Sequence, residues 1–356
     1  MEFADLRKKA SDLRKQGAWE EALACYEELT FRFADDCTEW EYWGQAYCLF
    51  KLGKYREAET FCRSYLEKEE MFQPLGNVLA WALYCQYLRN EQEEEAVVTG
   101  IAEEITTLCR QEDQYSPYVT TVFRVLELLG KKFPYPADQI LYWTGKLNPG
   151  QLDDTPAKIN RPEGKEMELA SRREQYYMVV TRALYESARY EECAERCDEV
   201  LSGGLQLHYD NVVWFRRRKA LCLYYMGRTE EAIALMREVF ARKKNWFVRF
   251  ELGEMLMRNG EKEEGISLLA SAAIEKGDQE KKLKLYASLA NWYENNGMPE
   301  TAIRHYALIW LFRDEMGWKE DDEVRSRLDK AGVDLRDLPA PERLFEDLYP
   351  DGKNLR

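Results

Sequence analysis

Apolar residues recur every three or four positions along most of the 356-residue chain, which is the spacing of one face of an α-helix. The segments with this spacing are short, and Gly-containing turns separate them, as in "RKQGAWEEALACYEEL" and "YYMGRTEEAIALMREV". After each turn come a polar start, a small residue, and bulky residues four and seven positions later. Because Gly readily adopts the left-handed conformation that ends a helix, the pattern predicts a series of helical hairpins.

The hairpin unit recurs at a nearly constant interval. The turn residues are 36 apart in the first two copies, and 33 and 37 apart in three later ones. The clear copies have their turns at Gly17, Gly53, Gly227 and Gly297, and looser copies have theirs at Gly260 and Ala188. Small residues at two positions of each unit let the helix axes approach closely, while the bulky residues fill the space between neighbouring hairpins.

This arrangement resembles the tetratricopeptide repeat (TPR), a helical hairpin of about 34 residues. The resemblance covers most of residues 3–312, although the Pro that usually ends each unit is missing. It implies an all-α fold: a TPR-type helical-hairpin solenoid that forms a right-handed superhelix. It also implies a non-enzymatic adaptor or scaffold that binds a protein or peptide segment in its concave groove.

The repeat period fails in the middle of the chain and again after Gly317. We therefore expect four regions: N-terminal TPR hairpins over 1–70, a degenerate helical segment over 71–170, C-terminal TPR hairpins over 171–316, and a capping helix and tail over 317–356. Within the second region, "NPGQLDDTPAKINRPEGK" predicts a loop over 148–165, because it has three Pro and two Gly among polar residues. A polar capping helix is expected because the open end of a solenoid needs a solvated surface.

Apolar residues, many of them aromatic, form two stripes in "WEYWGQAYCLF" (40–50), where a surface helix needs only one apolar stripe. One stripe is Trp40, Trp43, Tyr47 and Phe50, and the other is Tyr42, Ala46 and Leu49. In a TPR the first helix of each hairpin lines the groove, and the small crossing residue sets which positions face it. The resemblance thus implies a partner-binding groove of Trp40, Trp43, Tyr47, Phe50, Arg182, Tyr185, Trp214, Arg217, Tyr224, Phe247 and Phe250.

The groove residues are aromatic or Arg, the residue types that concentrate binding energy at interfaces. They favour an external protein partner. The alternative is a tight superhelix in which the middle segment 111–167 or the C-terminal tail of the same chain fills the groove.

Charge bears on the choice of partner. The chain has 51 Lys and Arg against 65 Asp and Glu, a net charge of −14, which argues against a coat of nucleic-acid phosphate. Two basic clusters interrupt this background, "WFRRRK" (214–219) and "RKKNWF" (242–247). They suit single-stranded nucleic acid, an acidic aromatic peptide, or neutralisation of the chain's own carboxylates. The cluster residues are Arg216, Arg217, Arg218, Lys219, Arg242, Lys243 and Lys244.

A narrower resemblance supplies the second functional hypothesis. The order of "YSPYVTTVFRVLELLGKK", "ELASRREQYYMVVTRALYESARYEECAERC" and "RKKNWF" is similar to that in bacterial TPR proteins associated with antiviral conflict systems. It implies a nucleic-acid-associated regulatory component of a bacterial antiviral defence system, acting through the two basic clusters. A steep loss of affinity with salt would separate phosphate contacts from an aromatic-anchored peptide.

No motif for catalysis or cofactor binding is found. The sequence has no phosphate-binding Gly-rich loop, G-x-S-x-G or H-E-x-x-H, and only two His. Among nine Cys there is no C-x-x-C, and Cys193, Cys197 and His208 are too few for a zinc site. Without a visible secretion signal or a long apolar run, we expect reduced thiols, a cytoplasmic location and no membrane contact. We therefore expect that the chain is not an enzyme and binds no cofactor or metal. The identity of the partner and the oligomeric state are left open.

Overall fold

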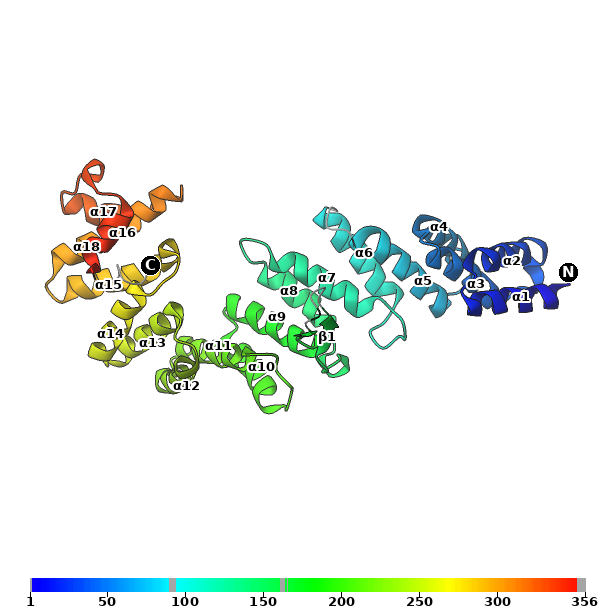
Figure 1. Ribbon diagram of the computed structural model, residues 1–356, viewed down its shortest axis with the longest axis horizontal. Coiled ribbons are helices and arrows are strands. Elements are labelled where there is room, and N and C mark those ends of the chain that lie inside the picture. The colour runs from blue at the N-terminus through cyan, green and yellow to red at the C-terminus, as the bar shows by residue number, and fades with distance from the viewer. Residues whose placement is uncertain (1, 90–93, 161–163, 165, 351–356) are drawn as a thin grey trace. The chain divides into compact units, whose positions relative to one another are not determined.

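The computed structural model describes residues 2–89, 94–160, 164 and 166–350. The chain divides into two compact units. Unit 1 comprises Met1–Thr155 and Ser171–Ser187, and unit 2 comprises Pro156–Ala170 and Ala188–Arg356. Each unit is built from helices that follow one another as antiparallel neighbours (Figure 1).

Unit 1 is a series of helices in which each packs on the next along the chain. Its longer helices are α1 (Phe3–Gln16), α2 (Trp19–Arg32), α3 (Glu39–Lys51), α4 (Tyr55–Leu66), α5 (Gln73–Leu83), α6 (Glu95–Leu108), α7 (Tyr118–Gly130), α8 (Ala137–Gly145) and α9 (Arg172–Glu186). Its short helices are η1 (Ala34–Asp36), η2 (Tyr84–Leu88) and η3 (Pro149–Gln151). Alternate helices also touch, α1 with α3 and α3 with α5, so first helices of successive hairpins form one layer.

Unit 2 repeats this arrangement. Its longer helices are α10 (Tyr190–Ser202), α11 (Asn211–Tyr225), α12 (Thr229–Arg242), α13 (Trp246–Asn259), α14 (Lys262–Ile274), α15 (Leu283–Asn295), α16 (Pro299–Glu315), α17 (Asp322–Lys330) and α18 (Pro341–Leu348). Its short helices are η4 (Gln279–Lys282) and η5 (Leu335–Asp337), and its strands are β1 (Ala157–Asn160) and β2 (Glu166–Leu169). In the described residues no helix is both long and apolar enough to cross a bilayer.

The predicted hairpin turns are confirmed by the backbone. The turn residues with positive φ include Gly17, Gly53, Gly227, Gly260, Gly297 and Ala188. At Gly17 the φ is 80°, and its N–H donates to the carbonyl of Arg14 while the next N–H donates to that of Leu13. These bonds satisfy carbonyls at the end of α1 that would otherwise lack a donor. The fold is therefore the expected all-α helical-repeat solenoid.

Small residues allow the close helix approaches that the repeat requires. A Cβ on Gly44 of α3 would come within 2.4 Å of the Tyr26 ring of α2. A Cβ on Gly253 of α13 would lie 3.0 Å from the carbonyl oxygen of Gly265 on α14. In this looser copy of the repeat both crossing positions are Gly. The backbones of α13 and α14 are therefore nearly in contact.

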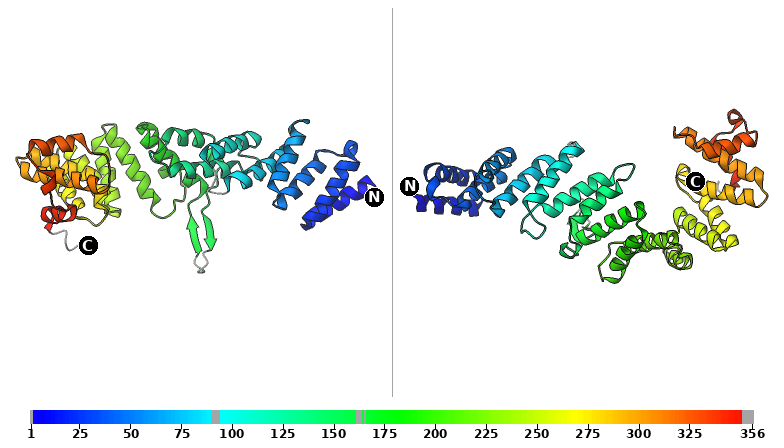
Figure 2. Two further views of the ribbon diagram at one scale, coloured as in Figure 1. Left: turned by 90° about the horizontal axis from the view of Figure 1, so that it is seen from above. Right: turned by 180° about the vertical axis from the view of Figure 1, so that it is seen from behind.

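The predicted loop over 148–165 is wrong in part, because residues 157–160 form strand β1. This strand pairs antiparallel with β2, Ala157 opposite Leu169 and Asn160 opposite Glu166, as a narrow two-stranded ribbon (Figure 2). A strand of four residues offers too few positions to show an alternating pattern, and its partner lies beyond the predicted loop. Residues 161–163 and 165 of that loop lie outside the described residues.

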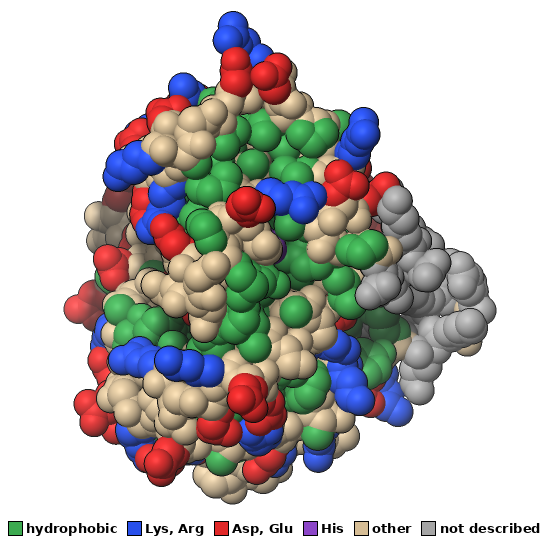
Figure 3. Space-filling model, turned by 90° about the vertical axis from the view of Figure 1, so that its left-hand side faces the viewer, with side chains coloured by type: hydrophobic (Ala, Val, Ile, Leu, Met, Phe, Trp, Pro, Cys, Tyr) green, Lys and Arg blue, Asp and Glu red, His purple; other side chains and the backbone are tan. Residues whose placement is uncertain are grey.

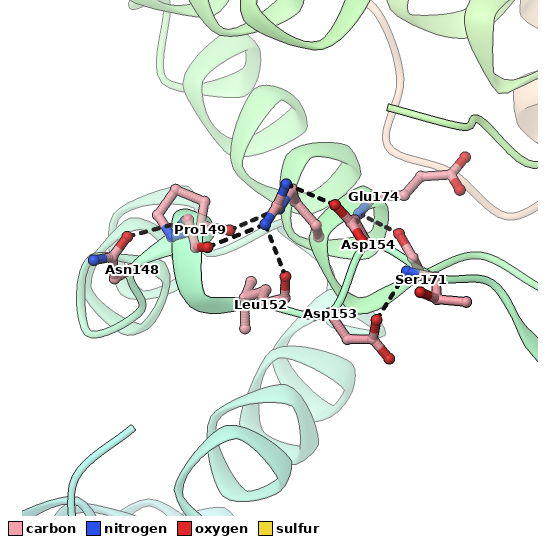
Figure 4. Close-up of polar contacts among 10 residues, drawn as sticks. Asn148, Pro149, Leu152, Asp153, Asp154, Ser171 and Glu174 are labelled. Carbon is pink, nitrogen blue, oxygen red and sulfur yellow. Dashed lines mark hydrogen bonds and ion pairs between the residues drawn. The ribbon is translucent and has the colours of Figure 1, made fainter. Parts of the chain in front are cut away.

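Residues 148–154 of the same segment are held by Arg173 at the start of α9. Its guanidinium donates to the carbonyls of Pro149, Gly150 and Leu152 over 2.9–3.1 Å. It also pairs with Asp154 at 3.1 Å. In Figure 4 the carbonyl groups and Asp154 are directed to the same guanidinium group. Ser171 caps α9 beside them. This part of the segment is therefore ordered by one long side chain that lies outside the predicted loop.

The C-terminal region folds back on the last hairpin. Both α17 and α18 pack on α16, and Leu344 and Phe345 of α18 are buried. On the α15–α18 side of the molecule, hydrophobic side chains stay at the surface between charged ones (Figure 3). Met298, Met316 and Trp318 are among those exposed in this region. Residues 351–356 of the predicted tail lie outside the described residues.

Candidate partner-binding surface

Three of the predicted groove residues form a continuous row of rings on α3. Trp40 meets Trp43 edge to face with ring centres 5.7 Å apart, and Trp43 stacks on Tyr47 at 5.1 Å. Phe72, before α5, extends the row at the Trp40 end, and Trp19 of α2 extends it at the Tyr47 end, at 5.0 and 5.8 Å. We call these five rings the aromatic ladder. Phe50, the fourth predicted residue on α3, packs instead against Tyr55.

Two cations lie over the aromatic ladder. The guanidinium carbon of Arg14 is 4.7 Å from the Trp43 ring centre, and the Lys51 Nζ is 5.4 Å from that of Tyr47. Within the described part of the chain, neither cation makes an ion pair with a carboxylate. Trp40 is 50% exposed, while Trp43 and Tyr47 are half-buried. The surface therefore combines accessible aromatic rings with two cations that pair with no carboxylate of the described residues.

Contacts at the start of α3 set the orientation of the aromatic ladder. The Glu41 carboxylate, 3% exposed, accepts hydrogen bonds from the N–H and hydroxyl of Thr38 at 2.9 and 2.8 Å. Its other oxygen pairs with Arg7 of α1 at 2.7 Å. A buried carboxylate needs such partners, so these bonds fix the first turn of α3 against α1. The Tyr26 ring against Gly44 then fixes the middle of α3 against α2.

The predicted groove residues of unit 2 are arranged differently. Trp214 of α11 lies 5.9 Å from Phe247 of α13, and the Arg217 guanidinium lies 5.0 Å from the same Phe247 ring. Arg217 also forms a two-bond ion pair with Glu251, with an Nε–Oε2 distance of 2.7 Å. Burial raises the pKa of Glu251 and Arg217 opposes the rise, so each group neutralises the other. This surface carries no net positive charge from Arg217.

The remaining predicted positions are spread over both units. Arg182 of α9 is exposed and lies 4.0 Å from the Tyr135 ring, both in unit 1, while Tyr185 is half-buried. In unit 2, the Tyr224 ring lies under Arg258 at 5.0 Å. Phe250 packs against the hydrophobic core of unit 2. The eleven predicted residues are thus divided between the two units.

The basic clusters are largely neutralised by the chain's own carboxylates. Successive residues of a helix are about 100° apart, so the run from Arg216 to Lys219 points in four directions. Arg216 pairs with Glu238 at 3.1 Å, and Lys219 pairs with Asp198. Arg217 pairs with Glu251, and in the second cluster Lys243 pairs with Asp210 at 2.6 Å. Burial lowers the pKa of Arg218, and the thiols of Cys193, Cys197 and Cys222 oppose this shift. Arg242 and Lys244 are exposed.

Sequence reasoning missed three residues of the aromatic-ladder surface and left a fourth, Arg14, out of the predicted partner-binding set. Trp19 and Phe72 lie outside the first helices of hairpins, where the repeat phase does not assign groove positions. Lys51 follows Tyr47 by four positions, a spacing that places two side chains on one helix face and that could have identified it. Arg14 lies at a groove position of the first hairpin, but only the folded helices bring it over Trp43.

The chain was compared with known proteins. The sequence profile of the tetratricopeptide repeat family matches residues 7–70 and 217–281. No curated protein sequence matches the chain.

Similar solved structures include a thermophilic TPR protein of Thermus thermophilus, at 13% identity and a TM-score of 0.26, covering 72% of this chain and 100% of that one. A tetratricopeptide repeat protein of Parabacteroides merdae has 11% identity, a TM-score of 0.35, and coverage of 92% and 97%. Human IFIT1, in a dimer with m7Gppp-AAAA, has 14% identity, a TM-score of 0.39, and coverage of 97% and 85%. The matched regions, together with the hairpins and their turns, show that the chain contains tetratricopeptide repeats.

Proposed function

We propose that this chain is a non-enzymatic scaffold that binds a protein or peptide segment on the aromatic ladder of unit 1. One observation carries the proposal: accessible rings lie beside two cations that have no carboxylate partner among the described residues. Aromatic and Arg side chains in such a surface are the residue types that dominate binding energy in protein interfaces.

The partner segment is expected to carry an acidic side chain next to an apolar one. A carboxylate can accept charge-assisted hydrogen bonds from Arg14 or Lys51 while these cations stay on their rings. An apolar side chain from the segment can pack against Trp40, whose exposed area is then removed from water. Both gains come from groups already in position, so little ordering is needed on the scaffold side.

The corresponding surface of unit 2 supports this proposal less well. There Arg217 is occupied by Glu251, and an incoming carboxylate would have to compete with a two-bond pair. Nucleic-acid binding through the basic clusters is weakened for the same reason, since Arg216, Arg217, Lys219 and Lys243 already have carboxylate partners. The net charge of −14 adds a general repulsion toward phosphate.

We infer that the scaffold works in the cytoplasm. All nine Cys are free thiols in the structure, and most are buried. A compartment that keeps thiols reduced suits such a chain.

A photo-crosslinking amino acid at position 40 tests the proposal directly. The full chain with benzoylphenylalanine in place of Trp40 is expressed in its native cell, irradiated, and analysed by mass spectrometry. A specific crosslinked protein should be found, and the Tyr47→Ala and Lys51→Met changes should reduce its yield. The same amino acid at position 214, on unit 2, is the matched control. Equal capture at both positions, or capture that Tyr47→Ala and Lys51→Met leave unchanged, would contradict the proposal.

A further inference from the structure

Helix α3 carries an aromatic residue on a second face, away from the aromatic ladder. Tyr42 follows Trp40 by two positions, which places it about 200° around the helix. There it lines a hollow of about 530 Å³ between the α2–α3 connection and the end of α4, within unit 1. We call this cavity the Tyr42 hollow. The sequence places Tyr42 in one apolar stripe with Ala46 and Leu49, both of which are buried, yet the Tyr42 ring is only half-buried.

Three aromatic rings form the wall of the Tyr42 hollow. The ring centre of Tyr42 lies 4.7 Å from that of Tyr65 and 6.4 Å from that of Phe61. All three side chains are half-buried and line the cavity. The face of an aromatic ring is the negative part of its quadrupole, and it attracts a cation.

Carboxylates add negative charge to the same cavity. Glu39 and Glu69 line it, both are exposed, and neither has an ion-pair partner among the described residues. Burial raises the pKa of Tyr65, and the charges of Glu39 and Glu69, which line the same cavity, raise it further. Lys68 is the one basic residue in the lining.

The Cys37 thiol also lines the cavity, but it does not change the net charge of the lining. Burial and the charges of Glu41 and Asp36 raise the pKa of Cys37 to about 11. The Cys37 thiol is therefore neutral at pH 7, and the charge of the lining is set by two carboxylates and Lys68.

We propose that the Tyr42 hollow binds an organic cation, an alkylammonium or guanidinium group. Aromatic faces attract such a group without requiring it to keep a full water shell, and the two carboxylates supply charge. A metal ion fits less well, because aromatic walls cannot replace its oxygen ligands. An anion would be repelled by the carboxylates of Glu39 and Glu69. The proposal is independent of the aromatic ladder, which lies on the other face of α3.

The probe for the test is Nα-acetylarginine amide, titrated calorimetrically into the full chain. The control ligand is Nα-acetylcitrulline amide, which has nearly the same shape and no charge. The arginine probe should bind with a dissociation constant of about 1 mM, and the citrulline probe should bind at least tenfold more weakly. A seven-residue Gly-Ser peptide with one central Arg separates the sources: tighter binding than the amide points to a protein side chain, and equal binding to a free small cation.

Variants of exposed residues then identify the site. The double change Glu39→Gln and Glu69→Gln should weaken arginine binding about tenfold, whereas Lys68→Met should strengthen it about threefold. Tyr42→Leu should weaken it about fivefold, and Trp40→Ala, on the other face of α3, should leave it unchanged. Circular-dichroism melts check that each variant is folded. If Tyr42→Leu unfolds, the exposed Glu and Lys variants still decide the question. Equal binding of citrulline, no effect of the double Gln change, or weaker binding by Lys68→Met would overturn the proposal.

Discussion

The guanidinium of Arg14 lies 4.7 Å from the centre of the Trp43 ring, so a residue of the first hairpin covers a groove residue of the second. The Arg14 Nε also donates a hydrogen bond to the Tyr26 hydroxyl at 3.3 Å, and the Tyr26 ring packs on Gly44. The candidate binding surface and the packing of α1, α2 and α3 therefore depend on the same side chains. Variants of this surface must therefore be tested for both binding and folding.

Trp43→Ala should reduce partner affinity much more than stability. Trp43 is half-buried between Arg14 and Tyr47, so we expect a stability loss of about 1–2 kcal/mol, below the roughly 3–5 kcal/mol of a core Trp. Partner affinity should fall by about 2 kcal/mol, roughly thirtyfold. Urea unfolding and a binding titration with the crosslinked partner measure the two quantities.

The control for Trp43→Ala is Trp214→Ala, which alters the predicted groove of unit 2. It should leave partner affinity unchanged, because Trp214 lies outside the aromatic ladder. Normal binding by a folded Trp43→Ala protein would sink the proposed surface. A severely lowered melting temperature would instead indicate that the stripe of Trp40, Trp43, Tyr47 and Phe50 serves packing alone.

Gly44→Ala should destabilise the protein although it adds one methyl group. The new Cβ would lie 2.4 Å from the Tyr26 ring, and moving that ring disturbs the contact between α2 and α3. We expect a loss of about 1–3 kcal/mol in the free energy of unfolding. Gly100→Ala in α6 is the matched control, since its Cβ would meet nothing within 4 Å and Ala favours a helix by up to about 1 kcal/mol. A Gly44→Ala protein as stable as Gly100→Ala would show that the close approach is not required.

Lys282 should make stability rise with pH between about 8 and 10.5. Its side chain is fully buried, and its Nζ donates to the carbonyls of Ala273, in the last turn of α14, and Glu275, just after it. Burial lowers the pKa of Lys282 to about 8, from 10.5 in the unfolded chain. Over that range the unfolded chain binds a proton that the folded chain does not, so raising the pH favours folding, by up to about 3 kcal/mol.

The measurement for Lys282 is urea unfolding of wild type and Lys282→Met at several pH values between 7.5 and 10.5. Tyr and Cys groups also titrate here, but they do so in both proteins. The stability difference, wild type minus variant, should therefore rise with pH. A difference that is constant or falls would contradict the assignment.

His305 should make stability fall on acidification. The carbonyl of Thr301 can only accept, so the His305 Nδ1 carries the proton, and the Nε2 accepts from the Tyr349 hydroxyl at 2.6 Å. Burial lowers the pKa of His305 to about 4 from 6.5, so the unfolded chain gains a proton first as the pH falls. Stability contributed by neutral His305 is present above pH 6.5 and is lost toward pH 4, by up to about 3 kcal/mol.

The test compares wild type with His305→Gln at pH 7 and pH 4.5 by urea unfolding. Wild type should lose more stability than the variant over this interval. Tyr349→Phe should cost about 1 kcal/mol at pH 7, because it leaves the buried Nε2 without its donor. An equal pH response in wild type and His305→Gln would exclude His305 as its cause.

The sequence by itself determined the repeat. A turn residue such as Gly17 and the small and bulky positions around it act over a few residues of chain, so their meaning does not depend on distant partners. For the same reason the helical spacing alone was enough to place Trp40, Trp43 and Tyr47 on one helix face.

Only the tertiary structure decided which of these residues are exposed and which cations are paired with carboxylates. Arg217 is neutralised by Glu251 from the next hairpin, whereas Arg14 has no carboxylate partner among the described residues, and nothing in the local sequence separates the two cases. Tyr42 lines a hollow because Phe61 and Tyr65 of α4 lie beside it. Charge and exposure are set by residues from other helices, and those contacts exist only once the hairpins have packed together.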